Sequence, residues 1–244
     1  MHTTRQTAIK ESKMKITTSK LIRWSGLSAM VAGIIFMAIQ PFHPADVLSS
    51  VNTSAWAITT SFKTAMSFFG ILGIMGIYAR QVEKAGWLGL IGFLLFSLFY
   101  ALQMCVSFIE PLILPLLTTT APQFVESFLK IPSGTASGTN LGALPIVYQL
   151  SGFLGYMLGG LLFGIATFRA RVLPRWAGAL LAIGTILPLL MSSLLPHPYD
   201  RILAIPVGLA LAWLGYALLS ERREQVSETV SGKVNAQILQ AETK

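Results

Sequence analysis

Two short motifs hold most of the chain's histidine and aspartate side chains. His43-Pro44-Ala45-Asp46 and His197-Pro198-Tyr199-Asp200 share the pattern His-Pro-x-Asp. The sequence has only two aspartates, both within these motifs, and of its three histidines only His2 lies elsewhere. Glu110 is also followed by proline at the end of an apolar run. Imidazole and carboxylate groups bind metals and polar ligands, so these three sites are candidates for chemistry.

Three interpretations of these sites remain open. Two imidazoles and one carboxylate are a common ligand set for zinc or non-haem iron, so His43, Glu110 and His197 would bind a metal if the sites meet. The two aspartates would then hold the imidazole rings in place. Without a metal, the same residues would form a polar rim that binds a ligand. The third interpretation is structural, since proline ends helices, Asp200 can cap the next helix, and histidine suits a helix C-terminus.

Lys63 lies inside an apolar run, where a charge is costly. Its ammonium either snorkels to the membrane surface or pairs with Glu110 or Asp46. A Lys63–Glu110 pair would turn the rim into a salt-bridged plug or a binding site for a polar headgroup. The ligand-binding candidates are therefore Asp46, Lys63, Gln103, Glu110 and Asp200. Other polar residues of the apolar runs predict interhelical hydrogen bonds or a substrate path: Tyr100, Gln103, Tyr148, Gln149, Ser151 and Tyr156.

Known catalytic signatures are missing from the sequence. It contains no Walker A motif, nucleophile elbow, HExxH motif or aspartate-rich motif. Its one cysteine, Cys105, excludes a disulfide or a cysteine-based zinc site within the chain. We therefore expect no cofactor beyond the zinc or iron of the metal interpretation.

The composition predicts a membrane protein. Apolar residues make up 53% of the 244 residues and charged residues 11%, with a mean hydropathy of +0.65. Soluble domains have about 25% charged residues, so this chain lacks the polar surface that water requires. A helix needs about 20 apolar residues to cross the hydrocarbon core, and in lipid such runs must be helical. Six runs meet this requirement: Leu21–Gln40, Ala57–Ala79, Trp87–Ile109, Leu144–Phe168, Leu173–Leu195 and Ile202–Ser220.

The distribution of basic residues predicts the orientation of these spans. Fifteen of the 18 lysines and arginines lie before the first span or at its start, in the loop after the second span, in the loop after the fourth span or at the start of the fifth, or after the sixth. Only Lys63, Lys130 and Arg201 do not. The positive-inside rule therefore predicts an all-α membrane domain over 21–220, with the polar segments 1–20 and 221–244 both in the cytoplasm. Basic charges beside anionic lipid headgroups explain the net charge of +8 without a nucleic-acid partner.

The starts of the outward-going spans resemble one another. Trp24, Trp87 and Trp176 each begin a Trp-x-Gly pattern near the cytoplasmic surface. This predicts three repeated helical hairpins, spans 1–2, 3–4 and 5–6, which would bring His43, Glu110 and His197 to one outer rim. The alternative is that tryptophan is a general interfacial anchor.

Glycine spacing and one outer loop give further local predictions. Glycines recur every three or four residues in several spans, including Gly155 and Gly159, and indicate faces where helices pack closely. In the loop after the third span, residues 122–130 place their apolar side chains on one helical face. We expect a short helix there, lying in the outer membrane interface. The following segment, 133–140, is rich in Ser, Thr and Gly and is typical of a flexible linker.

The stretch Gly164–Gly184 contains Leu173-Pro174-Arg175-Trp176-Ala177-Gly178. It resembles uncharacterised bacterial multi-pass membrane proteins in which a Leu-Pro-Arg-x-x-Gly turn joins two late spans, and Gly76–Gly89 is similar. The resemblance implies a bacterial plasma membrane location and no particular activity.

Two functions are expected from these features. The favoured one is a non-enzymatic membrane protein that binds or transports a small or lipidic ligand, or an accessory membrane subunit. Besides the lipid bilayer, its partners would be a second copy of the chain or a membrane protein encoded next to it. The alternative is a membrane-embedded metalloenzyme that uses the outer histidines and Glu110.

Overall fold

The computed structural model describes residues 17–136, 138–191, 194–195 and 199–220, which form helices and turns without a strand. The predicted polar segments 1–20 and 221–244 therefore lie almost entirely outside the described residues. In chain order the elements are α2 Thr18–Ile39, η1 Gln40–Phe42, η2 Leu48–Ser50, α3 Ser54–Leu112, α4 Leu114–Leu117, α5 Pro122–Leu129, α6 Leu144–Leu150, the π-helix η3 Ser151–Gly159, α7 Gly160–Ala170, α8 Arg175–Met191, η4 Tyr199–Ala204 and the C-terminal helix Asp200–Ser220, which overlaps η4.

The all-α prediction is confirmed for the described residues, and four of their helices are long and apolar enough to cross a membrane. They are Thr18–Phe42, Ser54–Leu112, Leu144–Ala170 and Asp200–Ser220, whereas α8 is apolar but only 17 residues long. Two of the six predicted spans, 57–79 and 87–109, lie within the 59-residue helix α3. The predicted loop between them is helical because Arg80, Gln81, Glu83 and Lys84 are good helix formers.

A sharp turn at Gly86 divides α3 into two arms. Gly86 has φ 58° and ψ −164°, a backbone conformation that glycine adopts without steric cost. The first arm, 54–85, then packs antiparallel to the second arm, 87–112. Three contacts along the arms show this: the Trp56 indole nitrogen donates to the Glu110 carbonyl oxygen at 3.1 Å, Thr64 bonds Ser107 at 3.4 Å, and the Tyr78 and Phe93 rings stack with centroids 4.6 Å apart. Thus α3 is a helical hairpin.

Glycines mark the contacts between neighbouring helices. A Cβ atom placed on most of them would lie less than 3 Å from an atom of the adjacent helix, so the backbones approach closely there. As residue numbers rise on one helix they fall on its neighbour, which makes each pair antiparallel. The close pairs are Gly73–Ala29, Gly76–Ser25, Gly92–Phe163, Gly155–Phe99, Gly159–Phe96, Gly160–Thr185, Gly164–Ala182, Gly208–Met37 and Gly215–Gly26. The packing faces predicted for Gly155 and Gly159 are confirmed.

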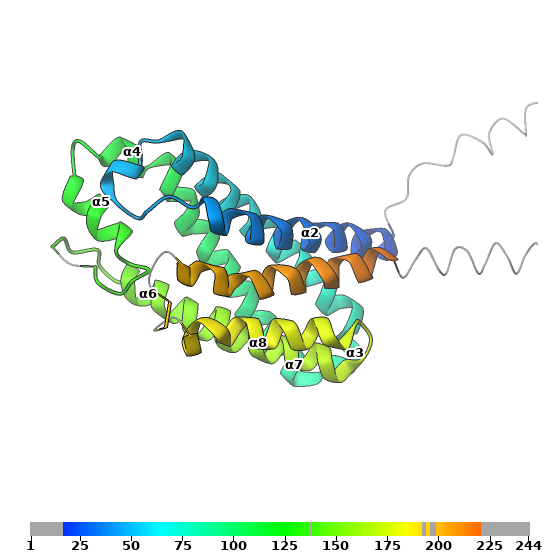
Figure 1. The fold of residues 1–244 in the computed structure, drawn as a ribbon. Helices are drawn as coiled ribbons and strands as arrows, with labels where there is room; N and C mark the ends of the chain where they lie inside the picture. Colours follow the sequence, from blue (N-terminus) through cyan, green and yellow to red (C-terminus); the bar gives the residue numbers. More distant parts are fainter. Residues whose placement is uncertain (1–16, 137, 192–193, 196–198, 221–244) are drawn as a thin grey trace, which may run out of the picture.

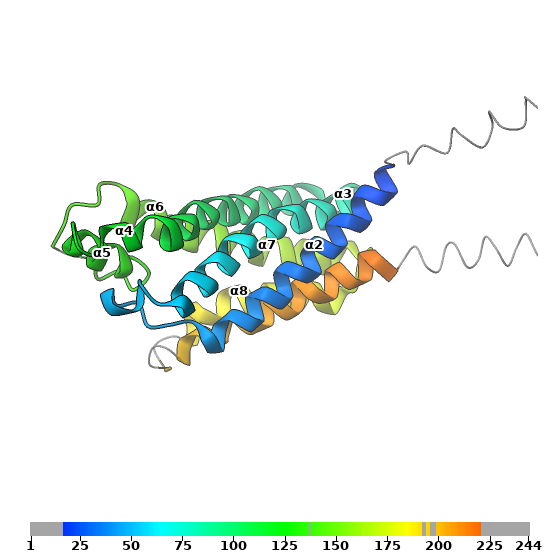
Figure 2. The ribbon, with the colours of Figure 1, turned by 90° about the horizontal axis from the view of Figure 1, so that it is seen from above.

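Together these contacts close a ring of helical segments. The order is α2, the first arm of α3, its second arm, η3 with α7, then α8 and the C-terminal helix, which returns to α2 (Figure 1). The beginning of α2 and the end of the C-terminal helix lie at the same end of the bundle in both views (Figures 1 and 2). The aromatic side chains of Phe96, Tyr100 and Phe163 are fully buried inside this circle of helices and fill its core.

A cap covers the other end of the bundle, where Figure 1 shows α4 and α5. We define the cap as η2, α4, α5 and residues 131–136 and 138–143. The short helix predicted at 122–130 is confirmed, whereas its predicted position in the membrane interface remains a prediction. Val125, Phe128 and Leu129 are buried in a second apolar core with Trp56 and Leu114. The sequence pattern was ambiguous because an apolar face can be covered by lipid or by protein.

The predicted triplication remains a prediction. Trp24, Trp87 and Trp176 are 67%, 79% and 63% exposed near the starts of α2, the second arm of α3 and α8. This fits both a repeated hairpin and a general interfacial anchor. In the closed ring, the two spans of each predicted hairpin are neighbours. All consecutive segments of the ring are neighbours, so this arrangement does not distinguish a repeat from an ordinary bundle.

Candidate functional site

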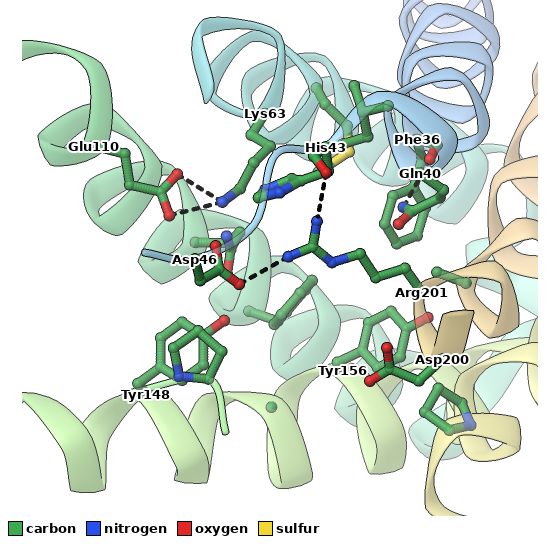
Figure 3. A pocket seen from close by; sticks show the side chains of 18 residues that line it. Phe36, Gln40, His43, Asp46, Lys63, Glu110, Tyr148, Tyr156, Asp200 and Arg201 are labelled. Atoms are coloured by element: carbon green, nitrogen blue, oxygen red, sulfur yellow. Dashed lines mark hydrogen bonds and ion pairs between the residues drawn. The ribbon is translucent and has the colours of Figure 1, made fainter. Parts of the chain in front are cut away.

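A cavity of about 330 Å³ lies between the bundle and the cap, at the end opposite Gly86. Figure 3 shows the side chains that line it. The end of α2, both arms of α3, η3 and the start of the C-terminal helix all contribute to its wall. His43 and all five predicted ligand-binding residues line the cavity. These five are Asp46, Lys63, Gln103, Glu110 and Asp200. Of the predicted site residues, only His197 lies outside the described residues.

Lys63 and Glu110 form an ion pair in the cavity wall. The Lys63 ammonium lies 2.7 and 2.6 Å from the two Glu110 carboxylate oxygens, and the side chains are only 14% and 9% exposed. Of the two explanations for the charge of Lys63, the structure therefore shows pairing with Glu110. The Trp56 indole N–H also donates to the Glu110 backbone carbonyl, so the same two arms are joined by a second contact beside the ion pair.

A second ion pair links the first His-Pro-x-Asp motif to Arg201, the residue after the second motif. The Arg201 guanidinium donates to the Asp46 carboxylate at 2.8 Å, and also to the carbonyl oxygens of His43 and Pro44 at 3.1 and 3.2 Å. Arg201 directly follows Asp200, the last residue of the second motif. The structure thus places Asp46 of the first motif and Asp200 of the second in the wall of the same cavity, while the predicted meeting of His43 and His197 remains a prediction.

His43 is held neutral at the edge of this network. Burial and the nearby positive charges of Lys63 and Arg201 lower its pKa from 6.5 to about 4, although the Pro44 carbonyl and Asp46 act in the opposite direction. The ring nitrogen Nδ1 lies 2.8 Å from the Pro44 carbonyl oxygen. The ring also packs edge-on against Trp56, with centroids 6.1 Å apart. Its surroundings therefore oppose a third positive charge beside Lys63 and Arg201.

The deeper wall of the cavity is aromatic and apolar. Phe36, Phe99 and Tyr156 line it, and the Tyr156 ring contacts both phenylalanines, with centroids 6.4 and 5.0 Å away. Tyr148, Gly152 and Tyr156 are spaced four residues apart along α6 and the π-helix η3, so they face the same cavity. π-Helical turns are uncommon and frequently occur at functional sites. Among the described residues, the buried Tyr156 hydroxyl has no hydrogen-bond partner.

The described residues do not assemble a metal site. No group of three or more His, Cys, Asp or Glu side chains among them is placed to hold a metal ion. Both oxygens of Glu110 bind the Lys63 ammonium, a cation that occupies the place a metal would need. Because His197 lies outside the described residues, the three-residue metal hypothesis remains a prediction.

Sequence reasoning missed Arg201 and the phenylalanines of the cavity wall. Arg201 was recognised only as one of three basic residues outside the cytoplasmic segments, although its position directly after Asp200 was a usable signal. Phe36 and Phe99 had no signal of their own, because lipid-facing and cavity-facing phenylalanines look alike in an apolar run. Tyr148 and Tyr156 were among the polar residues predicted to line a substrate path or bond between helices.

No known family, curated protein or solved structure matches this chain.

Proposed function

We propose that this chain is a bacterial plasma-membrane protein with six membrane crossings and both ends of the chain in the cytoplasm. The ring of six antiparallel segments supports six crossings, with the two arms of α3 and the short α8 each counting as one. The basic residues at the Gly86 end support a cytoplasmic position for that end. In this orientation the cavity and the cap lie at the outer side of the membrane.

We further propose that the cavity binds a small amphipathic ligand. The observation that carries this proposal is the division of its wall, with charged groups at one part and Phe36, Phe99 and Tyr156 at another. A ligand with a polar head and an apolar body would satisfy both parts at once. Binding sites for small molecules typically measure about 300–1,000 Å³, so this cavity suits a small amphiphile or a headgroup with the start of one chain.

Lys63 favours this function over the metalloenzyme alternative. A catalytic metal would need the Glu110 carboxylate as a ligand, and Lys63 already neutralises that carboxylate at hydrogen-bond distance. A buried pair of opposite charges instead gives a polar wall that needs no ion.

The test is to bind eight-carbon amphiphiles with different headgroups to the protein in lipid nanodiscs, by calorimetry. We expect at least one to bind saturably at one molecule per protein. Replacing Gly152 by Trp should abolish this binding, because Gly152 lines the cavity and a Cβ there meets no atom within 4 Å. The matched control is Phe153→Trp, one residue further on the same helix, where the side chain is 54% exposed.

Two results would overturn the proposal. One is that none of the amphiphiles saturates. The other is that Gly152→Trp binds them as well as the Phe153→Trp control, because the ligand would then lie outside the cavity.

A further inference from the structure

The charged side chains that line the cavity have partners within the protein. The Lys63 ammonium lies 2.6 Å from the Glu110 carboxylate, and the Arg201 guanidinium lies 2.8 Å from the Asp46 carboxylate. Asp200, the other charged residue of the described lining, also has an interaction partner. A charge that leaves water without gaining a partner is costly, and none of these five groups needs a charge from a ligand. The cavity therefore favours a ligand whose head is uncharged.

The other hydrogen-bonding side chains of the described lining carry no charge near pH 7. His43 is neutral because its pKa is lowered to about 4. Amide and phenol groups both donate and accept hydrogen bonds, as a ligand hydroxyl does, whereas an ammonium only donates and a sulfate only accepts. A hydroxyl therefore suits the uncharged groups of the wall better than either ion. These groups belong to Gln40, His43, Gln103, Tyr148 and Tyr156.

Tyr148 lies where the charged part of the wall begins. Figure 3 shows its side chain pointing from α6 toward Asp46. Tyr148 also lines a small void of about 10 Å³ together with Asp46 and Glu110. Tyr156 follows about two turns later on the same helical run and packs against Phe99, with ring centroids 5.0 Å apart. A ligand with its head at Tyr148 would therefore lay its chain along these two rings.

We propose that the cavity selects an amphiphile with an uncharged head that bears a hydroxyl, which bonds Tyr148 while the apolar chain lies against Phe99 and Tyr156. This inference rests on the proposed binding function and adds the charge and the type of the head. The same chemistry occurs in a neutral membrane lipid such as diacylglycerol and in a free long-chain alcohol.

The experiment compares four eight-carbon probes, bound to the full chain in phosphatidylcholine nanodiscs: 1-octanol, methyl octyl ether, octylammonium and octyl sulfate. Binding to the cavity is the excess over Gly152→Trp discs, which removes simple partitioning into the lipid. We expect 1-octanol to bind about tenfold more tightly than the two ions, because their charges lose water without gaining a partner. Methyl octyl ether should also bind less tightly than 1-octanol, since it has no O–H donor.

Tyr148→Phe removes only the hydroxyl that the head is expected to bond. It should weaken the binding of 1-octanol about 3- to 10-fold, the loss expected for one uncharged hydrogen bond. The matched control is Tyr216→Phe, because Tyr216 is 60% exposed on the C-terminal helix and does not line the cavity. This control should bind 1-octanol as the parent protein does. Equal binding by the two variants would overturn the assignment.

The failures of the two proposals can be told apart. If octylammonium, octyl sulfate or the ether binds as tightly as 1-octanol and Gly152→Trp abolishes that binding, the cavity binds amphiphiles but the hydroxyl assignment is overturned. If Gly152→Trp changes the binding of no probe, both proposals fall.

A second set of nanodiscs identifies the source of the hydroxyl. Discs that contain diacylglycerol should weaken the apparent binding of 1-octanol if a membrane lipid is the ligand, because the lipid would compete for the cavity. Unchanged binding would assign the site to a free alcohol. Both results keep the hydroxyl assignment.

Discussion

Lys63 and Glu110 connect the two arms of α3 near the cavity. Because both side chains are largely buried, removing one charge leaves the other without a partner in a poorly solvated place. We expect Lys63→Met to lower the free energy of unfolding by about 3–5 kcal/mol, the usual cost of breaking a buried ion pair. Thermal or denaturant unfolding in detergent would measure this.

The double variant Lys63→Met/Glu110→Gln is the control for that experiment. It removes both charges and should recover most of the lost stability, since no isolated charge remains. If the single and double variants are equally unstable, the loss comes from packing and not from the unpaired carboxylate.

His43 gives a prediction of pH dependence. Its pKa is about 4 in the folded protein and about 6.5 in an unfolded chain, so between these values the unfolded state binds more protons. The stabilising effect of the neutral ring is complete above about pH 7.5 and is lost as the pH falls towards 4. His43→Gln should therefore reduce the loss of stability between pH 7.5 and 5, by on the order of 1–2 kcal/mol. Melting temperatures of the parent and the variant, measured across this range, would check it. Parallel curves would contradict the buried neutral state of His43.

At the scale of elements, close glycine contacts decide which helices are neighbours. A side chain at Gly159 would collide with the backbone of Phe96, its Cβ lying 2.6 Å from that nitrogen. Gly159→Leu should therefore destabilise the protein by at least about 1–3 kcal/mol, the typical cost of overpacking. Gly152→Leu on the same helix is the control, because its Cβ meets no atom within 4 Å. Equal unfolding of the two variants in detergent would contradict the contact between η3 and the second arm of α3.

The sequence predicted best those features that depend on residues close together in the chain. Apolar runs predicted every bundle helix, and small residues at regular spacing predicted the packing faces, because both depend on the run itself. The continuous helix through residues 80–85 was missed because one glycine, Gly86, makes the whole turn. The Arg201–Asp46 pair was missed because its partners lie 155 residues apart. Such contacts depend on the closure of the ring, which no local pattern reveals.

At the scale of the whole molecule, the ring and the cap give the bundle two different ends. The core towards Gly86 is filled by buried aromatic rings, while the cavity and cap occupy the other end. A ligand in the cavity would therefore be approached from the cap end or from between the helices that surround it. Because the cavity lies at one end only, the proposed function depends on which side of the membrane that end faces.

The short helix α8 provides the most discriminating test of the six crossings. Its 17 residues rise about 26 Å, slightly less than the roughly 30 Å of the hydrocarbon core. Reporters fused after Lys84, Arg171 and Arg223 should therefore report the cytoplasm, whereas reporters within 41–56, within 117–141 and after Leu195 should report the outside. If α8 instead enters the membrane and returns, the reporters after Arg171 and Leu195 would lie on the same side. The C-terminal helix would then carry the Arg223 reporter to the opposite side. Five crossings would result, and the end of the chain would leave the side where 15 of its 18 basic residues are expected.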